Sequence, residues 1–313
     1  MIKDPLYLYD LPEYIKADAS NICNYPRMLI LQVSSYCNFS CRMCPRRNMV
    51  SRRKITGLGE GFMSLELIEK LIEESKHYKA FIGFLCALYG EPLMNPDIVK
   101  IVNMIKKAKL KIQIITNGSL LDEELSKNLI EAGLDKIKIS FQGTTPEEYA
   151  FWRNKPLFDV IKNNTLRLLE IRNKLHSSCY IQVGTSVSND TKEDIDKFVS
   201  YWKERADDVY WEYTGLLHVR HFPDIKNLKT KYESVKNVDP CRSFLVRLPV
   251  LWNGKVTRCC DDEEEWIGDA NTESIYDIWN SDRLNKDRET CKKLGNIWPA
   301  CKFCYTNTRV SKY

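Results

Sequence analysis

Three closely spaced cysteines are the residues whose types and spacing most clearly predict chemistry in this sequence. Cys37, Cys41 and Cys44 are spaced CxxxCxxC and follow directly after the apolar run 28–33. Three thiolates on one short loop can ligate three irons of a 4Fe-4S cluster and leave the fourth iron open to a small molecule. Disulfides suit short secreted chains, and structural zinc usually takes two CxxC pairs, so both alternatives fit this spacing less well.

A second group of cysteines lies in the last quarter of the chain. Two apolar runs, 244–252 and 255–258, flank Gly254 and predict a β-hairpin. The cysteines on either side of this hairpin and a later CxxC pair are Cys241, Cys259, Cys301 and Cys304. Four thiolates can hold structural zinc or a fully ligated 4Fe-4S cluster, and the spacing alone leaves both open. Cys260, next to Cys259, is an alternative ligand.

The composition predicts a globular, cytoplasmic protein. The 313 residues, 43% of them apolar, allow one large domain and a small one. Neither end has an apolar run long enough to span a membrane, and the N-terminus lacks the pattern of a secretion signal, so we expect no membrane association. Twelve cysteines in a reducing compartment favour cluster or metal ligation over disulfides. Basic and acidic residues are interspersed, and the net charge of +5 predicts no nucleic-acid partner.

A regular alternation of strands and helices is expected to position the first cysteine group. The predicted strands are 28–33, 80–88, 111–116, 136–141, 180–187 and 209–213. The predicted helices are 64–76, 95–108, 122–132, 157–175 and 191–205. Their predicted N-caps, whose side-chain oxygens can accept the free amide hydrogens of the first turn, are Ser64, Asn95, Asp122 and Thr191. This order predicts βαβ units and a parallel sheet.

The CxxxCxxC loop after a first strand resembles the radical S-adenosylmethionine (SAM) superfamily. In that superfamily the open iron binds SAM, and one-electron reduction releases a 5′-deoxyadenosyl radical that takes a hydrogen atom from the substrate. The resemblance implies an α/β fold with a partial (βα)6 parallel barrel, and active-site residues at the C-terminal ends of the strands. The expected divisions are an N-terminal strap 1–27, the barrel 28–213, a bridge 214–240 and a C-terminal iron–sulfur domain 241–313.

The same resemblance assigns SAM contacts to residues at or near the predicted strand ends. These residues are Met43, Gly90, Glu91, Pro92, Asn117, Ser140, Gln142 and Gly184. The turn at Gly90 matches one whose backbone holds the SAM amino group in relatives. Gln142 stands where relatives often have an acidic residue near the ribose, which puts that contact in doubt. Met43 replaces an aromatic residue near the adenine, and its thioether can supply an apolar contact instead.

The C-terminal cysteines resemble the Twitch domain, a short form of the SPASM domain. This resemblance favours a 4Fe-4S cluster over zinc, with Cys241, Cys259, Cys301 and Cys304 as its ligands, and implies one auxiliary cluster besides the SAM-binding one. The hairpin spacing and the compact end after the CxxC pair are most similar to the aminocyclitol dehydrogenases of butirosin biosynthesis. The expected cofactors are therefore two 4Fe-4S clusters and SAM.

The expected function is that of a radical SAM oxidoreductase acting on a carbohydrate or aminocyclitol-type small molecule. The resemblance implies removal of a hydrogen atom from a carbinol carbon, loss of the hydroxyl proton to a base and transfer of the second electron to the auxiliary cluster, which yields a ketone. Nothing in the sequence identifies the base. The stretch 46–54 contains five basic residues and could attract an anionic substrate. The electron donor implied by this chemistry is flavodoxin or ferredoxin.

Three alternatives to a dehydrogenase stay open. In an epimerase of a related sugar, a cysteine such as Cys86, on the predicted second strand, would return a hydrogen atom to the substrate. A peptide maturase is disfavoured because the strap 1–27 is too short for the peptide-recognition domain of many such relatives. A non-catalytic iron–sulfur electron carrier would not need the SAM positions at the strand ends.

Overall fold

The structure is a computed structural model that describes residues 22–46, 59–214, 242–260 and 265–294. Most of the predicted strap and bridge lies outside these residues, as do Cys241, Cys301, Cys304 and most of the basic stretch 46–54. In the described part of the chain, no helix combines the length and apolar character needed to cross a lipid bilayer.

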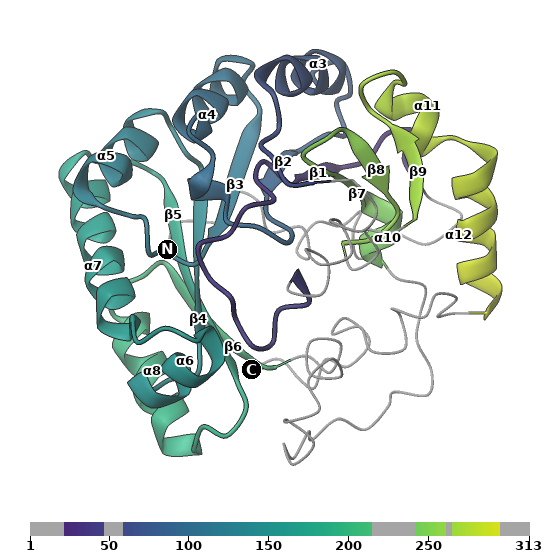
Figure 1. The fold of residues 1–313 in the computed structure, drawn as a ribbon. Helices are drawn as coiled ribbons and strands as arrows, with labels where there is room; N and C mark the ends of the chain where they lie inside the picture. The colour runs from purple at the N-terminus through teal and green to yellow at the C-terminus, as the bar shows by residue number, and fades with distance from the viewer. Residues whose placement is uncertain (1–21, 47–58, 215–241, 261–264, 295–313) are drawn as a thin grey trace.

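One curved sheet of nine strands runs through the molecule (Figure 1). Six parallel strands form the barrel wall: β1 Met28–Leu31, β2 Gly83–Cys86, β3 Lys111–Thr116, β4 Lys136–Gln142, β5 Tyr180–Val187 and β6 Asp208–Tyr213. Three more extend it beyond β1: β7 Arg247–Val250, β8 Lys255–Thr257 and β9 Trp266–Asp269. The order is β6-β5-β4-β3-β2-β1-β7-β8-β9. The predicted partial parallel barrel is confirmed.

Helices lie on the convex side of this sheet (Figure 1). They are α3 Leu65–Ser75, α4 Ile98–Lys107, α5 Glu123–Glu131, α6 Pro146–Arg153, α7 Phe158–Lys174 and α8 Lys192–Lys203. Three of the predicted caps are confirmed, because the side chains of Ser64, Asp122 and Thr191 accept hydrogen bonds from first-turn amides. The helix α6 was not predicted; it begins with Thr145 as N-cap and Pro146 in its first turn.

The predicted cap Asn95 is wrong. Pro92 begins a short 3-10 turn, η2 Pro92–Met94, and α4 starts only at Ile98. Asn95 is instead a buried link, since its Nδ2 donates to the carbonyl oxygen of Val33 at 2.7 Å. The proline displaced the helix start because its fixed φ favours a tight turn.

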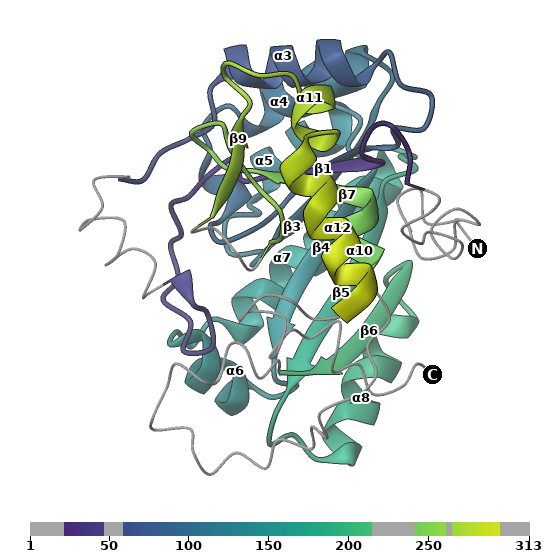
Figure 2. The same ribbon diagram turned by 90° about the vertical axis from the view of Figure 1, so that its right-hand side faces the viewer.

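The C-terminal part of the chain continues the barrel sheet. Strand β7 pairs with β1 in parallel, and β8 pairs with β7 as the predicted hairpin around Gly254. The prediction of a strand over 244–252 is wrong in its first residues, because the helix α10 Arg242–Val246 extends to Val246. Two further helices follow, α11 Ile275–Trp279 and α12 Asp282–Leu294. Figure 2 shows α11 beside α3, where the Glu74 carboxylate accepts the backbone N–H groups of Ile275 and Tyr276 at 2.9 and 2.7 Å.

Side-chain alternation separates the two faces of the barrel wall. On β4, Phe141 packs against aromatic rings of α6, α7 and α8, which identifies the helix-covered face. The opposite side, here called the inner face, carries Ser140 and Gln142. Residues paired in register lie on the same side of a sheet. The inner face therefore also includes Gly184 and Ser186 of β5, and Tyr210 and Glu212 of β6.

Candidate functional site

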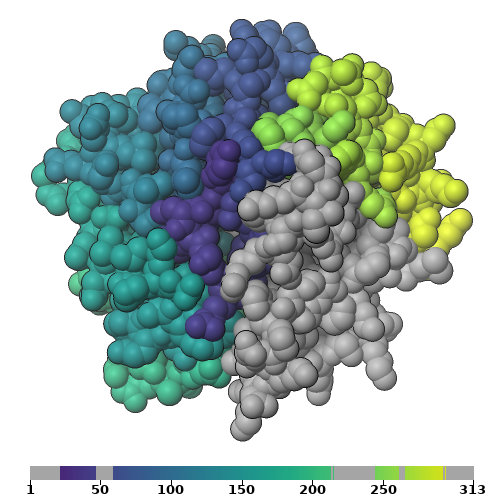
Figure 3. All heavy atoms as spheres, in the orientation of Figure 1, coloured from purple at the N-terminus to yellow at the C-terminus, as the bar shows by residue number. Residues whose placement is uncertain are grey.

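The loop 34–46 that carries the first three cysteines, here called the cluster loop, runs across the C-terminal ends of β1 to β3. Figure 3 shows the purple segment that contains it at the surface near the centre of the viewed face. The carbonyl oxygen of Tyr36 accepts the Glu91 N–H at 2.8 Å. Asn38 donates to Ser119 at 2.8 Å and accepts from Asn117 at 2.9 Å. The predicted residue Asn117 therefore positions the cluster loop directly.

Gly90 is required where the cluster loop meets the end of β2. A Cβ atom at this position would lie 1.9 Å from the carbonyl oxygen of Ser34, so no other residue fits without moving the backbone. Two residues earlier, Leu88 adopts the left-handed region with φ of 77°. Such strain in a non-glycine residue is held in place by surrounding structure and is concentrated at functional sites.

The end of α6 holds the cluster loop from the other side. The Arg42 N–H donates to the carbonyl oxygen of Trp152 at 2.7 Å, and the Arg42 guanidinium lies 4.7 Å from the centre of the Phe151 ring. The Lys155 ammonium lies 5.4 Å from the centre of the Phe39 ring. The helix that the sequence did not predict is thus a main support of the predicted cysteines.

The three cysteines fit an iron–sulfur cluster. None of them forms a disulfide, and burial raises the pKa of Cys37 to about 11 and that of Cys44 to about 12. Buried thiols of this kind become thiolates only when a cation replaces their protons, as cluster irons do. No three His, Cys, Asp or Glu side chains in the described ranges converge on a single-ion site. A 4Fe-4S cluster does not require such convergence, because each thiolate binds a different iron.

Arg153, the last residue of α6, supplies positive charge beside these sulfurs. Its Nη1 lies 3.6 Å from the Cys41 Sγ, and its Nη2 donates to the carbonyl oxygen of Ser140 at 2.6 Å. Its Nε is shielded from solvent and has no acceptor among the described residues. A cationic group facing a cysteine sulfur fits an anionic, thiolate-ligated cluster.

Glu91 is fully engaged by the protein. Its Oε1 accepts from the Leu93 N–H at 3.1 Å and the Thr116 hydroxyl at 2.6 Å, and its Oε2 accepts from the Asn117 N–H at 2.8 Å. Burial raises its pKa, while these three hydrogen bonds act to lower it. The carboxylate joins the ends of β2 and β3, and Pro92 then starts η2. The Glu91 carboxylate is thus engaged within the protein, and the predicted SAM contacts of this turn stay a prediction.

The predicted residues of β4 and β5 lie together on the inner face. Ser140 of β4 pairs with Gly184 of β5, which pairs with Tyr210 of β6. Gln142 is buried and donates from Nε2 to the Thr214 hydroxyl at 2.7 Å. That nitrogen is therefore engaged within the protein, which keeps the predicted ribose contact of Gln142 a proposal. Met43, a residue of the cluster loop, is buried and belongs to the apolar core.

Gly184 gives a first testable prediction. A Cβ atom here would lie 2.4 Å from Cε1 of Tyr210, so Gly184→Ala is expected to lower the free energy of unfolding by about 1–3 kcal/mol through overpacking. Tyr210→Ala in the same chain removes the clash, so the double variant should lose less stability than the sum of the two single variants. Chemical denaturation of all four proteins measures this coupling, and additive losses would contradict the contact.

Cys86 does not lie where the epimerase alternative requires. It pairs in register with Ile114 of β3, which pairs with Ile137 of β4. Ile137 is on the same side as Phe141, so Cys86 belongs to the helix-covered face and is fully buried. Its pKa is raised to about 12 by burial. Its predicted role as a hydrogen-atom donor to substrate in the barrel is therefore wrong. The sequence could not show the face that Cys86 occupies, because all four residues of β2 are buried and show no alternation.

Of the auxiliary-site cysteines, Cys259 and its neighbour Cys260 lie within the described residues. Both follow β8, and the carbonyl oxygen of Cys259 accepts the Thr257 hydroxyl at 3.1 Å. Neither forms a disulfide. The other three predicted ligands fall in parts of the chain that the structure does not describe, so the ligand set stays a prediction.

Glu212 is a candidate functional residue that the sequence reasoning did not select. It occupies the inner face at the end of β6, in register with Ser186 and through it with Gln142. No hydrogen bond or ion pair engages its carboxylate within the described part of the chain. The alternation of Tyr210 and Glu212 along the predicted strand 209–213 was the signal that could have indicated it.

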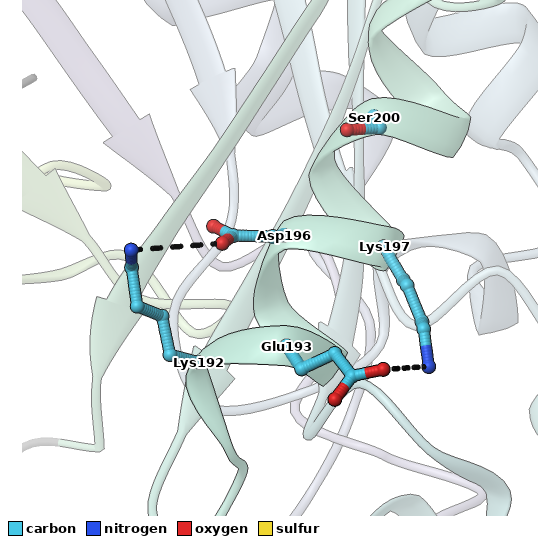
Figure 4. A pocket seen from close by; sticks show the side chains of 5 residues that line it. All are labelled: Lys192, Glu193, Asp196, Lys197 and Ser200. Atoms are coloured by element: carbon cyan, nitrogen blue, oxygen red, sulfur yellow. Dashed lines mark ion pairs between the residues drawn. The ribbon is translucent and has the colours of Figure 1, made fainter.

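The hollow of about 570 Å³ along α8 is separate from this site. It is lined by Lys192, Glu193, Asp196, Lys197 and Ser200, and Figure 4 shows the two ion pairs among them. The Lys197–Glu193 distance is 2.7 Å, and the Lys192–Asp196 distance is 3.9 Å. It contains none of the predicted site residues, and its charges are paired and solvent-exposed, so we assign it no function.

Two family models match the sequence. The radical SAM superfamily matches residues 31–200, which is more than half of the 313 residues, and an iron–sulfur cluster-binding domain of the SPASM type matches residues 241–305. These matches cover both cysteine groups.

The relatives with known names are diverse. A probable GTP 3′,8-cyclase of Methanothermobacter thermautotrophicus is 35% identical over 144 residues, which are 46% of this chain and 44% of that protein. A tungsten-containing aldehyde ferredoxin oxidoreductase cofactor-modifying protein of Pyrococcus furiosus is 21% identical over 322 residues, covering 89% of this chain and 87% of that protein. The chain thus spans less than half of the first relative and most of the second.

Solved structures share the fold. BtrN in complex with AdoMet and 2-DOIA matches with a TM-score of 0.53 and 20% identity over 85% of this chain and 87% of that one. Streptococcus suis SuiB bound to S-adenosylmethionine matches with a TM-score of 0.58 and 15% identity over 91% of this chain and 73% of that one. The CxxxCxxC motif, the parallel barrel and the superfamily match agree with one another. The chain therefore belongs to the radical SAM superfamily and carries a C-terminal SPASM domain.

Proposed function

We propose that this radical SAM enzyme oxidises a secondary alcohol of a carbohydrate or aminocyclitol-type small molecule to a ketone. The observation that carries the proposal is the carboxylate of Glu212 at the C-terminal end of β6, which lies on the inner face and which no side chain or backbone group of the described residues engages. Ser186 and Gln142 lie beside it in register. Hydroxyl, amide and carboxylate groups together suit a ligand with several hydroxyl or amino groups.

In this proposal Glu212 holds the reacting alcohol and accepts its hydroxyl proton. When bound, SAM and its cluster would supply the radical chemistry at the carbinol carbon, and the auxiliary cluster would serve as the acceptor of the remaining electron. One hydrogen atom, one proton and one electron leave the alcohol, which balances its conversion to a ketone. A carboxylate within reach of the hydroxyl is a suitable base.

The likeness to BtrN, the butirosin radical SAM dehydrogenase, supports a small-molecule substrate at the level of the fold. SuiB is also a neighbour, and one of its structures is bound to the precursor peptide SuiA, which keeps peptide modification as the second candidate. Cys86 lies on the helix-covered face of the sheet and therefore does not support an epimerase. We further propose a flavodoxin or ferredoxin as electron donor and a cytoplasmic location.

Product analysis with carbinol-deuterated cyclitols, aminocyclitols and sugars tests the proposal. We expect one of them to pass deuterium to 5′-deoxyadenosine and to yield a ketone in equal amount. Solvent deuterium at carbon in an unoxidised product would indicate an epimerase. Turnover only with peptides would contradict the proposal.

Glu212→Gln gives the matching residue-level prediction. The amide keeps the size of the side chain but cannot accept the proton as a carboxylate does, so ketone formation should fall by about 10²-fold or more. Slow SAM cleavage in the absence of substrate should be unchanged. Glu193→Gln on the exposed face of α8 is the matched control, and equal ketone formation by the parent and both variants would remove Glu212 from the mechanism.

A further inference from the structure

The guanidinium of Arg153 connects the cluster loop to the barrel wall at one point. We propose that Arg153 is a positioning residue that holds the Cys41 thiolate by an N–H···S hydrogen bond and thereby raises the reduction potential of the SAM-binding cluster. The inference rests on membership of the radical SAM superfamily and is independent of the substrate. Its basis is the 3.6 Å contact from Nη1 to the Cys41 sulfur together with the 2.6 Å bond from Nη2 to the Ser140 carbonyl.

The guanidinium is fixed in this position from several directions. Arg153 ends α6, and the next residue, Asn154, is in the left-handed conformation with φ of 57°, which turns the chain away after the helix. The Ser140 carbonyl orients the guanidinium plane, and the ring of Tyr149 lies 6.0 Å from its central carbon. No carboxylate forms an ion pair with Arg153 among the described residues, and its Nη1 faces the Cys41 sulfur.

The cluster loop is fixed against the same helix end. The residue after Cys41 donates its backbone N–H to the Trp152 carbonyl at 2.7 Å, and the Asn154 amide donates to the Ser40 hydroxyl at 3.3 Å. Neighbours of Cys41 and of Arg153 are therefore joined on both sides of the N–H···S contact. Thermal motion of the loop cannot easily separate the two groups.

A positive charge and a donated hydrogen bond favour the more negative, reduced cluster. Hydrogen bonds to cluster sulfurs are among the factors that set iron–sulfur potentials, and partners of this kind tune metal sites through their ligands. A charge-assisted bond is roughly twice as strong as a neutral one. Arg153 would ease the entry of the single electron that SAM cleavage requires, without itself taking part in bond breaking.

The test is a redox titration of the reconstituted full chain without SAM, followed by electron paramagnetic resonance. A parallel sample with SAM identifies the signal of the SAM-binding cluster, because only that cluster responds to SAM. We expect Arg153→Gln to reduce the equilibrium constant for reduction about tenfold, which is a potential about 59 mV lower for one electron. Arg153→Lys keeps the positive charge, so the reduction potential of its cluster should lie between those of Arg153→Gln and the parent.

Lys155→Gln is the matched control. It also removes one positive charge beside the cluster loop, yet its contact is with the Phe39 ring and not with a cysteine sulfur. A parent-like potential in Arg153→Gln would overturn the inference, as would an equal shift in Lys155→Gln. Weaker SAM binding with an unchanged potential would overturn it too, by assigning Arg153 to SAM instead. If Arg153→Gln does not load its cluster, the potential of Arg153→Lys decides, and a parent-like value rejects the role.

Discussion

Replacement of Cys37, Cys41 and Cys44 by Ala is expected to abolish 5′-deoxyadenosine formation and to lower the iron content from about eight to about four per chain. The three thiols lie on a loop anchored by the ends of β2 and β3 and by α6, so the variant loses the ligands while the anchors stay. Iron analysis and the absorption spectrum of anaerobically reconstituted protein measure this. The auxiliary cluster should remain, because its predicted ligands are separate residues.

Cys179→Ala is the control for this experiment. Cys179 is also a buried cysteine, but it lies just before β5 and away from the cluster loop. We expect full cluster loading and SAM cleavage, with a loss of about 1 kcal/mol in the free energy of unfolding. Parent-like iron content in the triple variant would contradict the ligand assignment.

Glu91→Ala is expected to give the second large effect. The change removes three buried hydrogen bonds and leaves the N–H groups of Leu93 and Asn117 without their acceptor. A loss of about 3 kcal/mol or more in the free energy of unfolding follows from the cost of unsatisfied buried donors. SAM affinity should fall as well, because the ends of β2 and β3 and the cluster loop lose their common support.

Thermal denaturation and equilibrium SAM binding measure the two consequences. Glu124→Ala on the exposed side of α5 is the matched control and should leave both unchanged. If Glu91→Ala were as stable as the parent and bound SAM more weakly, Glu91 would be a direct SAM ligand, and its proposed structural role would be wrong.

Local sequence patterns predicted most of the barrel. The strands 111–116 and 180–187 match the observed bounds, because their β-branched residues and flanking polar turns act over short distances. The caps Ser64, Asp122 and Thr191 were predictable for the same reason. Asn95 failed because Pro92, three residues earlier, set a tighter turn.

Features that depend on distant residues could not be predicted from these patterns. The face occupied by Cys86 is invisible in a strand buried on both sides. The parallel pairing of β7 with β1 joins residues far apart in the sequence. The same holds for the contact between Arg153 and Cys41 and for the register that brings Glu212 to Gln142. The sequence pattern predicted the cysteines of the cluster loop as ligands, but the side chains that surround them could be found only in the structure.

The most direct test of the central claim is the formation of 5′-deoxyadenosine from SAM by the reconstituted protein under strong reductant, with and without a panel of cyclitols, aminocyclitols and sugars. The account predicts slow formation by the protein alone and faster formation with at least one polyol, accompanied by its ketone. No 5′-deoxyadenosine from protein that carries both clusters, in the presence or absence of every polyol, would contradict it.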